Sequence, residues 1–137
     1  MKDFKQDIKK GSNMYGNTAH NIYAQNNIGI ESPAKLIAML YEGVLRFNAQ
    51  AKKSIKDNDV EKRVYWINRS TAIITELTGI LDVKEGGQIA EYLAGLYNYQ
   101  IQLLAEAGKE NSPEKMDECS NVFRTLLATW RETTDVA

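Results

Sequence analysis

The chain has 137 residues, and its 17 lysines and arginines nearly balance its 18 aspartates and glutamates, giving a formal net charge of −1. This length suits one domain with a sizeable core, and the balanced charge provides no overall field for binding nucleic acid. No apolar run reaches membrane-spanning length and no signal-peptide pattern is present, so we expect no stable membrane insertion and no secretion.

The chain starts with a polar segment, residues 1–31, that is rich in Asn, Lys, Gln and Gly. Its apolar residues are isolated, so it cannot build a core of its own. We interpret residues 1–13 as a leader or an engineered extension, and residues 14–31 as a flexible tail or short helical turn that lies on a surface. The apolar residues that would contact that surface include Tyr15, Ile22 and Tyr23.

A helix is predicted to start at Ser32-Pro33, because serine accepts a hydrogen bond from a free backbone N–H and proline fits the first helical position. Apolar residues follow in steps of three and four, the spacing of one helical face: Leu36, Ile37, Leu40, Val44, Phe47, Ala51 and Ile55. The run Asp57-Asn58-Asp59 breaks this helix, and Asp59 can cap the next one.

The second and third predicted helices each carry two neighbouring apolar stripes. In the second helix, the first stripe is Val60, Val64, Ile67, Thr71, Ile74, Thr78 and Leu81, and the second is Trp66, Ile73, Leu77 and Ile80. In the third helix, the first stripe is Ile89, Leu93, Leu96, Gln100, Leu103 and Ala107, and the second is Ala90, Ala94, Tyr97, Ile101 and Leu104. We expect Gly86-Gly87 to end the turn before the third helix and Gly108 to follow its last residue.

Ser112-Pro113 repeats the helix-start signal, and a fourth helix then carries Met116, Cys119, Phe123, Leu126 and Trp130 on one face. No alternating strand pattern is present. Four helices with short loops predict an all-α, antiparallel up-and-down four-helix bundle over residues 32–133, followed by a C-terminal tail at 134–137.

The sequence lacks the groups that enzymes and metal sites require. The single histidine, His20, lies in the polar leader, and the single cysteine, Cys119, lies on a core stripe. One histidine and one cysteine make a zinc or iron site improbable and exclude an internal disulfide. No glycine-rich phosphate loop is present. We therefore expect no enzymatic activity, no cofactor and no metal. The single cysteine fits a reducing compartment.

Lys52, Lys53 and Lys56 form a small basic cluster at the end of the first helix. The simpler interpretation is that these cations stabilise the helix C-terminus. The alternative interpretation is a weak patch for an acidic partner.

The middle two helices carry more apolar surface than a bundle requires. A bundle helix needs only one apolar stripe, and each of these two helices carries a second. Seven tyrosines and two tryptophans add to it. Grooves between helices can accept an amphipathic segment of another chain. The residues alone therefore predict a helical binding module.

The order of sequence landmarks resembles the FliS family of flagellar export chaperones. The resemblance runs over about residues 15 to 133. The most specific pieces are Ser32-Pro33 with Met39-Leu40-Tyr41, the run Gly86, Gly87, Leu93, Leu96 and Tyr97, and Trp130.

The resemblance implies a cytoplasmic bundle that binds the disordered C-terminal segment of flagellin, which wraps around it and becomes partly helical. Such a chaperone prevents premature polymerisation and delivers its client to the flagellar type III export apparatus. The implied partners are flagellin, an export-gate component and, as an open possibility, a co-chaperone. The resemblance also implies that residues 14–31 are a displaceable cap segment, with Tyr15, Ile22 and Tyr23 as candidate anchors, which covers part of the binding surface.

We place the flagellin-binding groove on the second stripes of the two middle helices, while noting that the stripes could be swapped. The predicted lining is Trp66, Ile73, Leu77, Ile80, Ala94, Tyr97, Ile101 and Leu104, with Asn68 and Arg69 as polar contacts. The alternative hypothesis is a regulatory adaptor that binds a signalling or anti-sigma protein through the same grooves.

Overall fold

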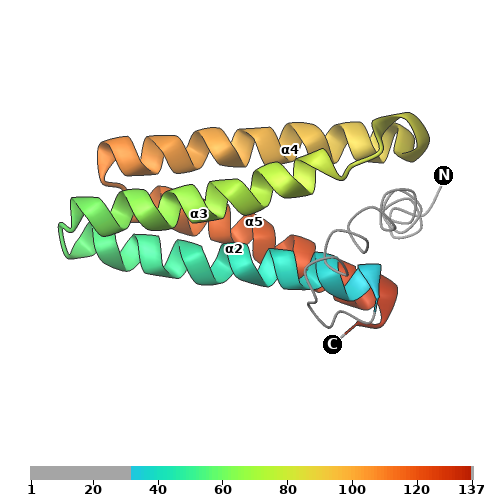
Figure 1. Cartoon of the computed structure of the whole chain (residues 1–137), viewed down its shortest axis with the longest axis horizontal. Coiled ribbons are helices and arrows are strands. Elements are labelled where there is room, and N and C mark those ends of the chain that lie inside the picture. Colours follow the sequence, from blue (N-terminus) through green and yellow to red (C-terminus); the bar gives the residue numbers. More distant parts are fainter. Residues whose placement is uncertain (1–31, 137) are drawn as a thin grey trace.

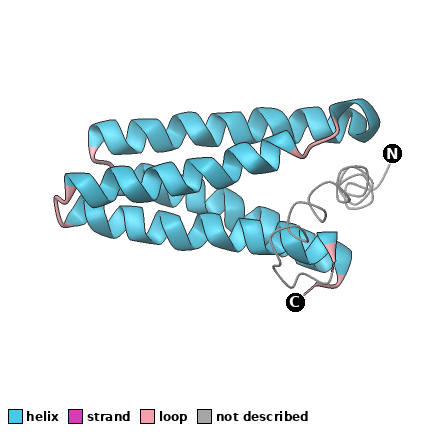
Figure 2. Cartoon of the chain, in the orientation of Figure 1, coloured by secondary structure: helices cyan, strands magenta, loops and turns pink. Residues whose placement is uncertain are grey.

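A computed structural model describes residues 32–136, and these form a four-helix bundle without strands (Figures 1 and 2). The helices are α2 (Pro33–Lys56), α3 (Val60–Gly79), α4 (Val83–Glu110) and α5 (Pro113–Thr134). The predicted all-α bundle is confirmed. The leader, the cap segment with Tyr15, Ile22 and Tyr23, and His20 lie outside the described residues.

The helices are arranged in a ring in which each packs against two neighbours. Helix α2 packs against α3 and α5, and α4 packs against the same two helices from the opposite side. Consecutive helices run in opposite directions because their connections are short (Figure 1). The first and last described helices therefore lie side by side, and a residue on α2 can face either α3 or α5.

Polar caps begin all four helices. The side chains of Ser32, Asp59 and Ser112 accept hydrogen bonds from the backbone N–H groups three residues later, as their positions in the sequence predict. Asp82 does the same for α4, with its carboxylate 3.0 Å from the N–H of Glu85. This last cap was not predicted.

The predicted end of α4 at Gly108 is wrong, whereas its predicted start is matched in part by a break in the helix at Gly87. The helix begins at Val83, six residues before Ile89, and Gly87 forms a kink inside it with φ 61° and ψ −141°. At the other end Gly108 is helical, and Asn111 terminates the helix in the left-handed conformation that asparagine tolerates. A Cβ at Gly108 would lie 3.0 Å from Cδ1 of Ile67, a tight contact, so α3 and α4 approach closely here.

The core holds several polar contacts among its apolar side chains. Asn48 is fully buried, accepts a hydrogen bond from Ser70 Oγ at 2.7 Å, and donates to Ser120 Oγ at 3.2 Å. Its third contact, to Cys119 Sγ, is 3.4 Å long. Elsewhere the indole N–H of Trp130 donates to the carbonyl of Ala34 at 2.7 Å, which joins the end of α5 to the start of α2.

Two features are absent from the described part of the chain. Among residues 32–136, none of the helices combines the length and apolar character needed to cross a bilayer. Within the same range, no cluster of three or more His, Cys, Asp or Glu side chains is placed to hold a metal ion.

Candidate partner-binding surface

The two stripes of α3 face different neighbours. A Cβ at Gly43 of α2 would lie 2.8 Å from Cδ1 of Ile73, and the Trp66 ring lies 5.5 Å from that of Phe47. The stripe predicted to line the groove therefore faces α2. Ile67, from the other stripe, packs against Gly108 and so faces α4.

On α4, the predicted groove residues divide between two directions. Tyr97 points into the bundle, where its ring stacks 6.3 Å from Phe123 of α5 and its hydroxyl lies 2.7 Å from that of Tyr41. Ala94 and Ile101 precede Gly108 by multiples of seven residues, so they share its side of the helix, toward α3. The stripes of α3 and α4 chosen for one groove therefore do not face each other. On α3, the stripe that contains Ile67 faces α4, and this stripe was not the one predicted to line the groove.

Half of the predicted groove residues are core residues. The exposed fractions are 2% for Leu77, 7% for Ile80, 2% for Tyr97 and 0% for Leu104, so these side chains are not open to a partner in this conformation. Their apolar spacing fits a core as well as it fits a groove, which is why the sequence did not separate the two. Trp66, Ile73, Ala94 and Ile101 are half-buried, and the predicted polar contacts Asn68 and Arg69 are exposed.

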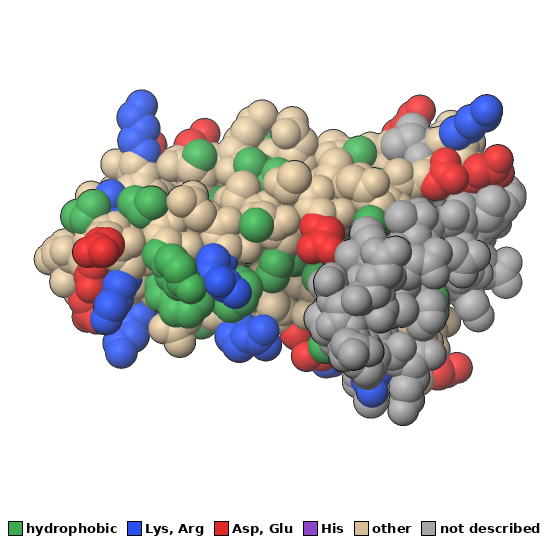
Figure 3. Space-filling view, in the orientation of Figure 1, with side chains coloured by type: hydrophobic (Ala, Val, Ile, Leu, Met, Phe, Trp, Pro, Cys, Tyr) green, Lys and Arg blue, Asp and Glu red, His purple; other side chains and the backbone are tan. Residues whose placement is uncertain are grey.

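Two of the predicted residues, Trp66 and Arg69, lie in an aromatic patch on α2 and α3, which also includes Phe47, Tyr65 and Arg46. The rings of Tyr65 and Trp66 meet edge to face at 4.8 Å, and Tyr65 is 50% exposed. The guanidinium of Arg69 lies 4.8 Å from the centre of the Phe47 ring and donates to the Tyr65 hydroxyl at 3.2 Å. Figure 3 shows hydrophobic side chains gathered beside a basic one over these two helices.

This patch can bind an amphipathic segment without any chemical step. Arginine guanidinium groups lie over the Phe47 and Tyr65 rings, and Tyr65 keeps half of its surface exposed for contact with a partner. Arg46 also lies over Phe47, at 5.3 Å, so the patch is positively charged at its edge. Sequence reasoning identified Trp66 and Arg69 but placed Phe47 on a core stripe and did not consider Arg46. The spacing of Tyr65 and Arg69, four residues apart, is the signal that could have found the pair.

Two described side chains, Cys119 and Lys115, have clearly shifted pKa values. Burial raises the pKa of the Cys119 thiol to about 11, which keeps it protonated and unreactive at neutral pH. Hydrogen bonds to Glu110 and then to Glu106 raise the pKa of Lys115 above its usual range. This lysine bridges the end of α4 and the start of α5, so its role is structural.

Comparison with known proteins identifies the family. The family model described as "Flagellar protein FliS" matches residues 15–137 of the chain. The chain belongs to the FliS family. The flagellar secretion chaperone FliS of Campylobacter jejuni subsp. jejuni serotype O:6 is 53% identical over 119 residues, covering 87% of this chain and 93% of the relative.

More distant FliS relatives match over a similar extent. The flagellar secretion chaperone FliSB of Pseudomonas aeruginosa is 31% identical over 121 residues, covering 85% of this chain and 96% of the relative. The FliS of Salmonella typhimurium is 28% identical over 122 residues, covering 84% and 90%. The predicted family membership is therefore confirmed.

Proposed function

We propose that this chain is a cytoplasmic export chaperone that binds the disordered C-terminal region of flagellin. It keeps flagellin subunits from polymerising early and delivers them to a component of the flagellar type III export gate. The observation that carries the proposal is membership of the FliS family, whose 53% identical relative is a flagellar secretion chaperone. The four-helix bundle supports it, because the bundle can present apolar surface to a client without a reactive site.

We assign the first contact of the flagellin segment to the aromatic patch. Tyrosine, tryptophan and arginine are the residues that most often dominate binding energy at protein interfaces. Tyr65, Trp66 and Arg69 offer all three types on adjacent turns of α3, and Asn68 lies exposed between them. Ile73, Ala94 and Ile101 are half-buried and would be reached only if the segment extends along α3 and over α4.

We keep Tyr15, Ile22 and Tyr23 as the proposed anchors of a cap segment that covers part of the binding surface until a client displaces it. A co-chaperone is a further proposed partner. Folding of a disordered segment on binding costs ordering entropy, so a large apolar contact is needed even for moderate affinity.

Calorimetry with purified flagellin tests the proposal. We expect a 1:1 complex with full-length flagellin, a negative heat-capacity change from apolar burial, and no binding to flagellin that lacks its C-terminal region. Absence of heat with the full-length protein over a range of temperatures would reject the function. Enrichment of a signalling or anti-sigma protein instead of flagellin from a lysate would favour the adaptor alternative.

A pair of tyrosine variants tests the assigned surface. Tyr65→Asp places a charge in the aromatic patch and should weaken flagellin binding about tenfold or more, as expected for a residue at the centre of an interface. Tyr92→Asp on α4 is the matched control, since Tyr92 is 59% exposed and Tyr65 is 50% exposed. Equal affinities of the two variants for flagellin, with helicity unchanged in both, would remove the patch from the binding site.

A further inference from the structure

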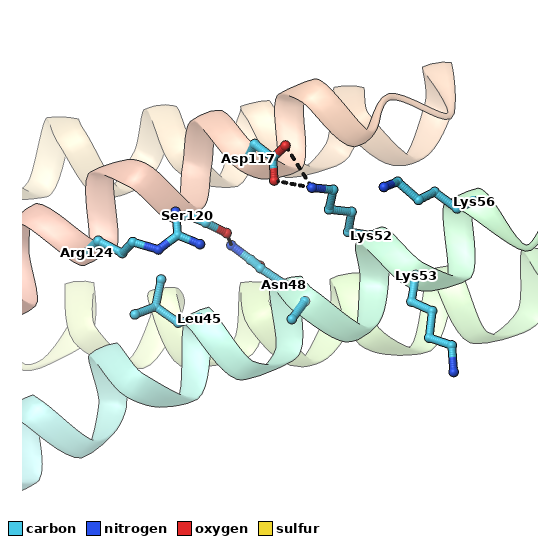
Figure 4. A pocket seen from close by; sticks show the side chains of 9 residues that line it. Leu45, Asn48, Lys52, Lys53, Lys56, Asp117, Ser120 and Arg124 are labelled. Carbon is cyan, nitrogen blue, oxygen red and sulfur yellow. Dashed lines mark hydrogen bonds and ion pairs between the residues drawn. The ribbon is translucent and has the colours of Figure 1, made fainter.

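A polar cleft lies between α2 and α5, at an interface of α2 that the aromatic patch does not use. It has a volume of about 410 Å³ and combines basic, polar and apolar side chains. Figure 4 shows Lys52 and Lys56 of α2 and Arg124 of α5 directed toward the space between the helices, whereas Lys53 points away from it.

The charge in this cleft is not balanced. Asp117 is the carboxylate of the lining, and Lys52 pairs with it at 2.9 Å. Within residues 32–136, neither Lys56 nor Arg124 has a carboxylate partner. Arg124 is held instead by a hydrogen bond from Nη1 to Asn121 Oδ1 at 2.6 Å. The cleft therefore keeps two unpaired cations, one on each helix, although the whole chain carries a net charge of −1.

The floor of the cleft offers a buried hydrogen-bond donor. Ser120 is 6% exposed, and its Oγ accepts a hydrogen bond from Asn48 Nδ2 at 3.2 Å. In the described part of the chain, no acceptor is present for the proton of this hydroxyl. Because a buried hydroxyl is costly to leave without an acceptor, an oxygen of a ligand that enters the cleft would be stabilised here.

The length of the cleft indicates which kind of anion it can bind. From Leu45 to Lys56 the lining extends along about three turns of α2, which is roughly 16 Å. A single phosphate group cannot contact both ends, whereas an extended peptide of about five residues spans that length. Leu45 and Ala49 add apolar contacts along the α2 side of the cleft.

We propose that the α2/α5 cleft binds an acidic peptide segment of a protein partner, with carboxylates at Lys56 and Arg124 and an oxygen at Ser120. This site goes beyond the proposed flagellin chaperone function and does not depend on it. It also gives a specific role to the basic cluster at the end of α2. A chaperone with this second surface could hold its client and contact another protein at the same time.

Titration of the full chain with a fluorescein-labelled hexapeptide of glutamate and leucine tests the proposal. We expect saturable binding that weakens with added salt, and no binding of the matched peptide in which glutamine replaces glutamate. In amide NMR spectra, the largest shifts should fall on Ala49, Lys52, Ser120 and Arg124. Shifts that cluster on another face, or equal binding of the glutamine peptide, would overturn the proposal.

Charge-removing variants locate the contacts. Lys56→Gln and Arg124→Gln should each weaken the glutamate peptide about threefold, and the double variant about tenfold, the range for partly exposed ion pairs. Lys109→Gln on α4 is the matched control and should bind as the unmodified chain does, with the same circular dichroism. Unchanged affinity of the double variant would refute the site. If sodium tripolyphosphate binds more tightly than the peptide, the cleft is a site for a small polyanion and the peptide proposal is wrong.

Discussion

Replacing Asn48 with alanine tests how strongly the buried polar network holds α2, α3 and α5 together. Asn48 has no exposed surface and contacts Ser70, Ser120 and Cys119. The variant loses two conventional hydrogen bonds, each worth about 1 kcal/mol, and one weak contact to sulfur. It also leaves the Ser70 hydroxyl without its acceptor in the core, at a further cost of about 1–2 kcal/mol.

The expected total loss is therefore about 3–4 kcal/mol, a large part of the roughly 5–15 kcal/mol by which such domains are stable. Urea denaturation followed by far-UV circular dichroism measures this free energy of unfolding. Asn68→Ala is the matched control, because Asn68 is exposed on α3, and it should change stability by at most about 0.5 kcal/mol.

A double-mutant cycle with Ser70→Ala isolates the hydrogen bond itself. Ser70→Ala leaves Asn48 Oδ1 without this donor, so each single variant already breaks the 2.7 Å contact. The double variant should then be more stable than the sum of the single losses by about 1 kcal/mol or more. Fully additive losses, or a cost of less than about 1 kcal/mol for Asn48→Ala, would show that the network does not stabilise the bundle as its geometry indicates.

Two further predictions follow from backbone conformation and from titration. Gly95→Ala should stabilise the chain by about 0.5–1 kcal/mol, because alanine favours helix and its Cβ would meet nothing within 4 Å. Gly87→Ala should destabilise it by about 1–3 kcal/mol, because Gly87 has a positive φ of 61°. Urea denaturation compares the two variants, and stabilisation by both would contradict the kink at Gly87. The pKa of the Cys119 thiol is raised from 9.0 to about 11. Burial of the protonated thiol therefore contributes its full stabilisation of the fold below pH 9, and this contribution is lost between pH 9 and 11. Relative to Cys119→Ser, the unmodified chain should lose about 2–3 kcal/mol of stability over that range, and parallel stability curves would count against burial of the thiol.

The helices could be predicted from the sequence because their start signals are local. Ser32, Asp59 and Ser112 each cap a helix through a backbone N–H only three residues away, so no knowledge of the fold is required. The first turn of α4, which begins at Val83, was missed because Gly86-Gly87 is typical of the end of a turn. In the structure Asp82 caps a helical turn before the kink at Gly87.

The binding surface could be predicted only in part, because periodicity gives a residue's direction around its own helix and not the neighbour it meets. Leu77 and Trp66 share one stripe, yet Leu77 is 2% exposed and Trp66 is half-buried beside Phe47. The α2/α5 cleft was less predictable still. It depends on the packing of α5 against a helix about 70 residues earlier in the chain, which no local pattern encodes.

The contact between the Trp130 indole and the Ala34 carbonyl joins residues 96 positions apart. It lies where α5 closes the ring against α2, so α2 keeps one side uncovered while only the first three described helices have been synthesised. During translation on the ribosome, that side of α2 must remain accessible to other apolar segments until α5 emerges. Because α5 is synthesised last of the four helices, this side of α2 is covered only when α5 packs against it.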